Sequence, residues 1–447
     1  MHRFLALALL LAPCAFAQDV EDLKFELFEL RKRVAELDKR VEHLDSHFHN
    51  GEGEHDGDTH FKLLDLSLNI RTAAGASTST NDELAGLQGG GHDPRRRGFS
   101  LQQAEFAFAG ALVPWFAGEA YLIATEETIE LEEAFLRSLG IPHGFEIKAG
   151  YFFTEFGRRN KVHPHDWLWA DQPVVLSRIL GGEGLRGLGG RVAYHAPLPF
   201  DLMFLFGAQN ADDHTAVSFL GESLHGHGGH DEEEEEEEDE EETIGGLHPV
   251  HRDFHTIGDL LYHTRMAFGF DIGMTRLEFG GSGAYGPNAS GPTGKTWLAG
   301  ADLLLGWSDG DCFVKLETEL LYRYYQANRQ VFENDPSDPL DDEVFEATVL
   351  GDWGFYAEIT GSAGLNLIFG ARIEYASGFR AGLEERRDDP FRDNRLRLSP
   401  LVAWAPIEEL RVSLQYNLDY TQHIGGRSSH SAWLSLSVMF GVHKHIH

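Results

Sequence analysis

From about residue 61 onward, apolar and polar side chains alternate with a period of two, and this alternation constrains the fold more than any other feature. A period of two is typical of β-strands that present one face to an apolar environment. In the segment 410–421, apolar residues occupy the even positions, and polar or charged residues occupy the odd positions. We identify sixteen segments of this kind. They span residues 61–71, 99–111, 116–125, 129–139, 145–154, 185–196, 200–210, 259–270, 274–285, 296–307, 312–325, 344–359, 365–376, 395–405, 410–421 and 432–442.

The connections between these segments alternate in length. One set consists of tight turns such as 197–199 and 272–273, and the other set contains long loops such as 155–184 and 211–258. Strands of about ten residues, with short turns at one end and long loops at the other, are typical of outer-membrane barrels. A soluble β-sandwich also alternates but usually has shorter strands. The pattern therefore predicts an all-β fold, a 16-stranded antiparallel transmembrane β-barrel over residues 61–442, with an aqueous lumen.

One expected strand departs from the alternation. In the segment 129–139, the acidic residues Glu130, Glu132 and Glu133 fall on both faces of a regular strand. The alternation of this segment is therefore broken.

The first residues have the features of a secretory signal. A basic start precedes an apolar run over 4–11, and Ala15 and Ala17 form a small-x-small cleavage motif. Residues 1–17 are therefore predicted to be a signal peptide, with lipidation at Cys14 as the alternative. An exported β-barrel is expected in the outer membrane of a Gram-negative-type bacterium, in contact with outer-membrane lipid.

A heptad pattern precedes the alternating region. Apolar residues spaced three and four apart run without a break from Val20 to Phe48. One helix cannot bury such a seam alone, so the segment 19–48 predicts a periplasmic α-helical coiled coil and, with the barrel, a homotrimer. A single amphipathic helix on a surface is the alternative. Residues 49–60 predict a hinge, and residues 443–447 form a His-rich tail.

The composition excludes several classes of protein. The chain has 447 residues, with 72 Asp and Glu against 37 Lys and Arg, and a formal net charge of −35. A nucleic-acid-binding protein needs a basic face, so we expect no nucleic-acid partner. Two cysteines exclude a disulfide scaffold and a Cys-rich metal site. The sequence contains no hydrolase, metalloprotease or nucleotide-binding motif, so we expect no enzymatic activity.

Histidines and carboxylates gather in the long loops. Twelve consecutive acidic residues run from Asp231 to Glu242, directly after three histidines, and a His-Pro-His-Asp motif lies in the loop 155–184. Imidazole and carboxylate groups suit zinc and other divalent cations, although no cofactor is expected to be required. A solvated acidic loop that repels anions is the alternative. The candidate metal ligands are His163, His165, Asp166, His225, His227, His230, Asp231, His248, His251 and His255.

Charged residues of the loop 155–184 and of several strands are expected to line or constrict a pore. A loop of this length that folds inward would narrow the lumen, and its cations, facing luminal acids, would create a transverse field. Pairing with lipopolysaccharide phosphates or with neighbouring carboxylates is the alternative. The candidates are Arg158, Arg159, Lys161, Arg178, Lys315, Glu317, Glu319, Arg323, Arg372, Glu374 and Arg411.

The stretch from Ile129 to Pro199 carries a family resemblance. It contains ELEEAF, GFEIKAG, a His-x-His pair and LGGEGL. These elements resemble porin-like, His-rich outer-membrane proteins often labelled zinc-regulated receptors, and the barrel pattern is similar to that of phosphate-selective porins. The resemblance implies an outer-membrane location and a link to zinc supply. Among functional residues it carries over only His163 and His165.

These observations predict a porin-like channel for the diffusion of small polar solutes or ions. His-rich and acidic outer loops would concentrate a divalent metal such as zinc near its mouth. Two alternatives stay open: a phosphate- or anion-selective porin, and a metal-binding surface protein whose barrel is only an anchor.

Overall fold

The computed structural model describes residues 60–113, 115–126, 128–221, 244–250, 252, 256–332, 343–364, 366–382 and 385–441. The chain divides into two units, Met1–His60 and Phe61–His447. The predicted signal peptide, coiled coil and His-rich tail lie outside the described residues, as do residues 49–59 of the predicted hinge and the acidic run of the long loop. The last residue of the predicted hinge, His60, belongs to the first strand.

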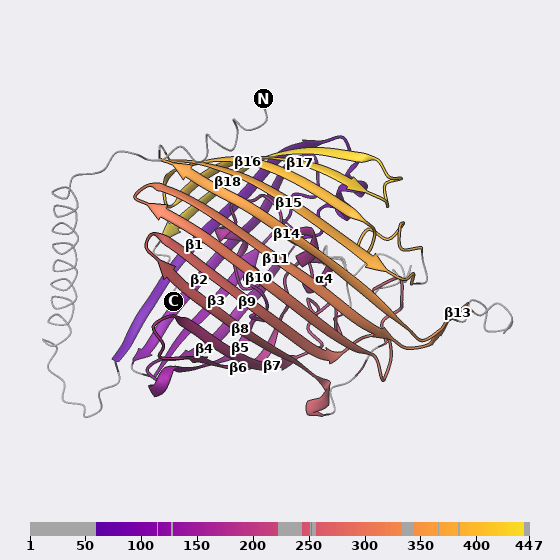
Figure 1. Cartoon of the computed structure of the whole chain (residues 1–447), viewed down its shortest axis with the longest axis horizontal. Coiled ribbons are helices and arrows are strands. Elements are labelled where there is room, and N and C mark those ends of the chain that lie inside the picture. Colours follow the sequence, from indigo (N-terminus) through magenta and orange to yellow (C-terminus); the bar gives the residue numbers. More distant parts are fainter. Residues whose placement is uncertain are drawn as a thin grey trace, which may run out of the picture. The chain divides into compact units, whose positions relative to one another are not determined.

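Sixteen strands form one closed antiparallel barrel (Figure 1). Each strand pairs with its neighbours in the sequence of barrel strands, and β1 pairs with β18 from Ser67 opposite Gly441 to Ser77 opposite Ser431. Closure leaves no strand of the barrel with an unpaired edge. The strands are β1 (His60–Ser77), β2 (Gly98–Val113), β3 (Phe116–Ala124), β4 (Ile129–Ser138), β5 (Phe145–Phe153), β6 (Arg186–His195), β7 (Asp201–Asn210), β8 (Leu260–Ile272), β9 (Thr275–Pro287), β10 (Lys295–Asp309), β11 (Cys312–Ala327), β14 (Thr348–Ala363), β15 (Leu367–Phe379), β16 (Arg395–Ile407), β17 (Leu410–Thr421) and β18 (Ser428–Gly441).

The predicted all-β fold and the number of strands are confirmed, and most strand ends agree within a few residues. Four strand boundaries differ by four residues or more, among them the end of 344–359, which lies at Ala363, and the start of 432–442, which lies at Ser428. The predicted strand 344–359 starts at Thr348 instead, because Glu343–Phe345 (β13) pairs with Gln330–Phe332 (β12) in a separate two-stranded sheet. The first strand continues past residue 71 to Ser77, where small residues without clear alternation pair with β18.

Short helices occupy some of the connections. The helix α3 (Asn81–Leu87) starts at a capping box, in which Thr80 Oγ1 accepts from the Glu83 amide and the Glu83 carboxylate accepts from the Thr80 amide. The helix α4 (Val174–Leu180) starts after Pro173 and ends at Gly181, whose φ of 95° favours glycine. The 3₁₀ turns are η1 (Pro142–Gly144), η2 (Pro164–Asp166) and η3 (Ile257–Asp259). Within the described residues, none of the helices has the length and apolar character to cross a membrane.

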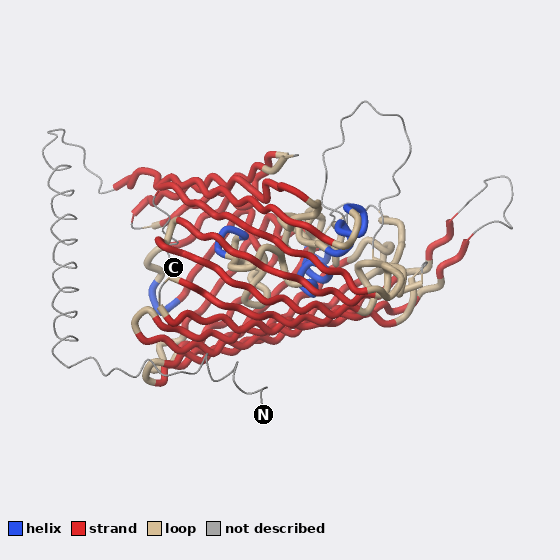
Figure 2. Tube along the Cα trace, turned by 90° about the horizontal axis from the view of Figure 1, so that it is seen from above, coloured by secondary structure: helices blue, strands red, loops and turns tan. Residues whose placement is uncertain are grey.

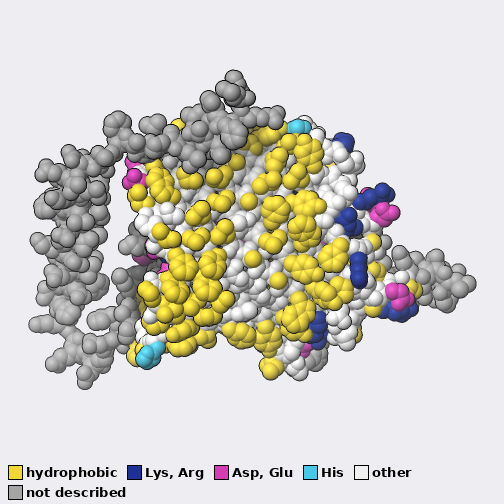
Figure 3. All heavy atoms as spheres, viewed as in Figure 1, with side chains coloured by type: hydrophobic (Ala, Val, Ile, Leu, Met, Phe, Trp, Pro, Cys, Tyr) yellow, Lys and Arg dark blue, Asp and Glu magenta, His cyan; other side chains and the backbone are white. Residues whose placement is uncertain are grey.

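The two faces of the barrel wall differ as the alternation predicts. Leu414 on β17 and Leu434 on β18 point outward and are 55% and 51% exposed, whereas Gln415 and Asn417 point inward and are fully buried. Hydrophobic side chains cover much of the outer face of the strands, and charged side chains gather toward one end (Figure 3). A broad apolar exterior of this kind is suited to lipid rather than water.

The interior is not aqueous at every level, which corrects the expectation of a wet, charged lumen throughout. Loop residues such as Phe156, Ile179 and Phe219 pack with wall residues such as Leu298 and Leu321 in one buried apolar cluster. Loops and helical turns accordingly lie within the ring of strands (Figure 2). Part of the lumen is therefore filled by a core that folded loops and the wall build together.

The outward face of β18 offers a test of the lipid-facing assignment. An arginine in place of Leu434, in the middle of the strand, is expected to lower the free energy of unfolding in lipid vesicles by about 2–4 kcal/mol. The same change at Phe440, close to the strand end, is expected to cost at most about 1 kcal/mol. Urea titrations of both variants measure the difference, and equal losses would contradict a lipid-facing belt.

Candidate functional site

The connection between β5 and β6, residues 154–185, folds into the barrel. Its Arg158 pairs with Glu278 on β9, and its Arg159 pairs with Glu358 on β14. Its Asp171 is bonded to β15, β16 and β17. One segment can contact strands on different sides of a barrel only from the inside. The segment 154–185 therefore crosses the interior, and we call it the inner loop.

Asp171 is the most densely bonded residue of the inner loop. It is fully buried, pairs with Arg372 on β15, and accepts from Arg397 Nη1 on β16 at 2.9 Å. On β17, Gln415 Nε2 donates to it at 2.8 Å and Asn417 Nδ2 at 2.6 Å. Burial raises the pKa of Asp171, but the two arginines and the amide donors outweigh this effect and hold it below its usual range. The carboxylate therefore fixes the loop to three neighbouring strands as an anion.

The predicted cations of the inner loop are mostly neutralised by direct contacts. Arg158 pairs with Glu278, Arg159 Nη2 lies 3.1 Å from Glu317 Oε1, and Arg178 pairs with Asp393. Lys161 is exposed. The expected transverse field requires loop cations that face acidic residues across an open lumen. These arginines instead contact carboxylates directly. The alternative of pairing with neighbouring carboxylates describes them better.

The predicted wall residues on β11 also meet the inner loop. Glu319 Oε1 accepts from the Arg158 amide at 3.2 Å and from the Arg159 amide at 2.8 Å. Lys315, whose side chain is partly exposed, lies 3.3 Å from Glu317. These three β11 residues therefore lie on the inner face of the barrel wall.

The remaining wall candidates lie against the loop as well. Arg323 pairs with Asp352 at 2.7 Å and donates to the Arg178 carbonyl at 2.8 Å. Glu374 accepts from the Val174 amide at 2.6 Å. Further contacts join Arg372 to Asp171, and Arg411 to the carbonyls of His165 and Trp167. The structure therefore brings these residues together as anchors of the inner loop rather than as a free charged lining.

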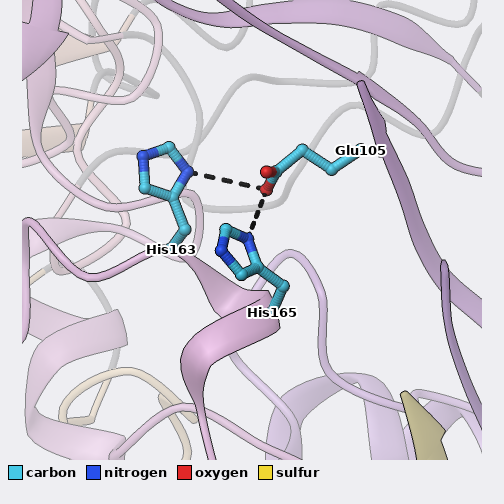
Figure 4. Close-up of side chains that lie close together, drawn as sticks. All are labelled: Glu105, His163 and His165. Atoms are coloured by element: carbon cyan, nitrogen blue, oxygen red, sulfur yellow. Dashed lines mark hydrogen bonds and ion pairs between the residues drawn. The ribbon is translucent and has the colours of Figure 1, made fainter. Parts of the chain in front are cut away.

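The His-Pro-His motif of the inner loop lies beside Glu105 of β2 (Figure 4). His165 Nδ1 is 2.8 Å from Glu105 Oε2, and His163 Nδ1 is 3.6 Å from the same oxygen. The three side chains are almost completely buried. The backbone around them is held by Arg71 on β1, which donates to the carbonyls of Pro164 and Trp169.

A β-bulge supplies two more carboxylates to His163. The pairing of β3 with β4 shifts between Tyr121 and Leu122, and Glu132 is the extra residue. As a result Glu132 and Glu133, although consecutive, are both buried, at 2.7 Å from His163 Nδ1 and 2.8 Å from His163 Nε2, respectively. Burial lowers the pKa of His163, but the three surrounding carboxylates raise it well above its ordinary value. The bulge explains the broken alternation of the segment 129–139.

A second cluster lies nearby in the same part of the wall. His92 Nε2 is 3.2 Å from Glu183 Oε2, and Glu130 completes a group of potential ligand atoms. Burial lowers the pKa of His92, but the Glu183 carboxylate raises it to about 9. Arg186 lies 3.3 Å from Glu130 and therefore competes with any cation for this cluster.

The structure brings together only some of the predicted metal ligands. His163 and His165 meet, and Asp166 Oδ1 lies 3.5 Å from His165 Nε2. His248 is separate, and its carbonyl accepts from Gln330. The candidates His225, His227, His230, Asp231, His251 and His255 lie outside the described residues. Glu105, Glu132 and Glu133 were not predicted as partners of the histidines, although the broken alternation of the segment 129–139 includes the last two.

No protein-family model matches the chain. An uncharacterized protein of Aquifex aeolicus (strain VF5) is 34% identical over 168 residues. That match covers 35% of this chain and 35% of the relative, so the chain spans about a third of the length of the relative it matches. The predicted resemblance to zinc-regulated receptors is not confirmed by these comparisons.

Several solved outer-membrane proteins have similar folds. OmpT of Vibrio cholerae has a TM-score of 0.48 at 9% identity, covering 84% of this chain and 97% of that one. The anion-selective porin of Comamonas acidovorans has a TM-score of 0.48 at 9% identity, covering 86% and 100%. The outer-membrane channel DcaP of Acinetobacter baumannii has a TM-score of 0.49 at 10% identity, covering 84% and 97%. The barrel architecture itself is established by the strand pairing of this chain.

Replacement of Asp171 by alanine tests the anchoring of the inner loop. The change leaves Arg372 with Glu374 and Arg397 with Asp419 as the remaining buried partners, and it removes the acceptor of Gln415 and Asn417. We therefore expect a loss of about 2–4 kcal/mol in the free energy of unfolding. Asp388→Ala removes an exposed ion pair with Arg387 and is expected to cost less than about 1 kcal/mol. Denaturant unfolding of both variants gives the comparison. Similar losses would show that Asp171 does not anchor the loop.

Proposed function

We propose that the protein is a channel of the bacterial outer membrane through which small polar solutes or ions diffuse. The observation that carries this proposal is the closed sixteen-stranded barrel, with an apolar exterior and inward-facing charged residues on several strands. A barrel of this size is wide enough for a water-filled passage unless loops fill it. The proposal includes contact with outer-membrane lipid and assembly into a homotrimer.

The inner loop would determine the size of the passage. It is bonded to β9, β11, β14, β15, β16 and β17, so it has little freedom to move away from the wall. Its arginines are paired with carboxylates, and the whole chain carries a net charge of −35. A passage of this kind would favour cations over anions, because unpaired positive charge is scarce beside the loop.

The long outer loop 211–258 would raise the concentration of divalent cations at the mouth. Its twelve consecutive acidic residues, Asp231 to Glu242, follow three histidines directly. This part of the proposal rests on the sequence. Zinc is the cation that the imidazole and carboxylate groups favour, and no cofactor is required for the channel itself.

A second candidate function is a metal-binding surface protein whose barrel is only an anchor. The apolar cluster inside the barrel favours it, since Phe156, Phe219 and Leu321 are all buried where an open pore would be wet. The anion-selective alternative has less support, because Arg158, Arg159 and Arg178 are each paired with a carboxylate.

Planar-bilayer recordings separate these candidates. We expect discrete single-channel conductance, and in a potassium chloride gradient a reversal potential that shows cation preference. Preference for chloride would overturn the cation-selective version. Absence of conductance, together with retained zinc binding, would favour the anchor.

Removal of residues 225–255 tests the contribution of the outer loop. The variant loses six histidines and the acidic run, so we expect fewer zinc ions bound per chain in an equilibrium titration. Its conductance at low zinc concentration should persist, because the barrel strands are intact. Unchanged zinc stoichiometry and affinity would remove the loop from the proposed function.

A further inference from the structure

The His-Pro-His motif and the wall form a group of converging ligand atoms inside the barrel. One ligand atom each from Glu105, His163 and His165 lies within 4.8 Å of the others. Ligands of a tetrahedral zinc ion at about 2.0–2.2 Å lie roughly 3.3 Å apart, so adjustments of about an ångström would complete such a site. Glu132, at 2.7 Å from His163 Nδ1, stands beside these three as a fourth candidate ligand.

Both imidazoles are arranged as in protein metal sites. Each directs Nδ1 toward Glu105 and places Nε2 near another carboxylate, Glu133 for His163 at 2.8 Å and Asp166 for His165 at 3.5 Å. A carboxylate that accepts from the far nitrogen fixes the ring and leaves the near nitrogen as a ligand. Arg71 and Arg411 hold the carbonyls of Pro164 and His165, so the motif is oriented by the wall.

The net negative charge of the carboxylates and Lys148 also favours the binding of a cation. Glu105, Glu132 and Glu133 are buried, and within the described part of the chain the permanent cation paired with them is Lys148, 3.6 Å from Glu133. Three carboxylates and one ammonium group leave two negative charges in a buried place, which is costly unless they are compensated. Protons on the two imidazoles can compensate them in the absence of a metal ion. One divalent cation bound by two neutral imidazoles would compensate both.

We propose that Glu105, His163 and His165, with Glu132 as fourth ligand, bind one divalent transition-metal cation inside the barrel. Two nitrogen and two oxygen ligands suit zinc. Glu133 and Asp166 orient the histidines and do not bind the ion.

This site is independent of the proposed conduction. It also differs from the zinc binding proposed for the outer loop 211–258. Its residues are buried, already lie close together, and come from β2, β4 and the inner loop. A bound ion would join the inner loop to two strands of the wall. Its occupancy would therefore stabilise the folded loop whether or not the lumen conducts.

Zinc titration of the variant that lacks residues 225–255 but is otherwise complete tests the site, because the outer loop cannot contribute to binding in this variant. In this background we expect zinc to bind and to raise the unfolding temperature. Glu105→Gln retains an oxygen that can accept from His165 but lacks the charge, so we expect at least a tenfold weaker affinity and a smaller thermal shift. His163→Gln with His165→Gln should abolish tight binding.

A histidine outside the cluster supplies the matched control. His214 lies 3.6 Å from Asp213 and is about half exposed, so His214→Gln is expected to leave the zinc affinity unchanged. Folding of every variant is checked by the shift in gel mobility on heating. If the background protein binds no zinc, or if folded Glu105→Gln binds it as tightly as the control, the site is disproved. Bilayer conductance is measured on the same samples, so failure of the metal site and failure of the channel are distinguishable.

Discussion

The closure of the sheet is the constraint on which the rest of the structure depends. A backbone that lies in lipid has no water to satisfy its polar groups, and pairing β1 with β18 satisfies the last open edge. Closure also fixes which side chains face inward, because adjacent residues of each strand alternate between lipid and lumen. Asp171 can therefore find Arg372, Arg397 and Gln415 on three successive strands. The inner loop is positioned by the register of the wall.

The interior combines two kinds of packing that are usually separate. An apolar cluster around Phe156, Ile179 and Leu321 lies in the same barrel as a network of buried arginine–carboxylate pairs. Buried pairs of this kind contribute little net stability, but they are costly to break and tolerate few alternative arrangements. The apolar contacts favour a loop folded inward, whereas the ion pairs select one position for it.

The sequence predicted the wall far better than what the wall encloses. Alternation is a local property, so the sixteen strands and the inward orientation of Glu317 and Arg372 could be read from neighbouring residues. Contacts such as Glu105 with His165 join residues 60 positions apart, and no local pattern encodes them. The bulge at Glu132 is an intermediate case, since the irregular run of acids was visible but its geometry was not. The charged inward-facing residues suggested a water-filled interior. The apolar residues that pack against the inner loop are dispersed along the chain, so the sequence did not reveal that they form one cluster.

The two arginines that hold the His-Pro-His motif come from the beginning and the end of the barrel. Arg71 belongs to β1 and Arg411 to β17, and these strands are separated only by β18, which closes the sheet. During biogenesis the inner loop is thus synthesised early but cannot complete its contacts until the last hairpin has joined the first strand. The complete set of contacts around the motif therefore requires both ends of the sheet to be in place.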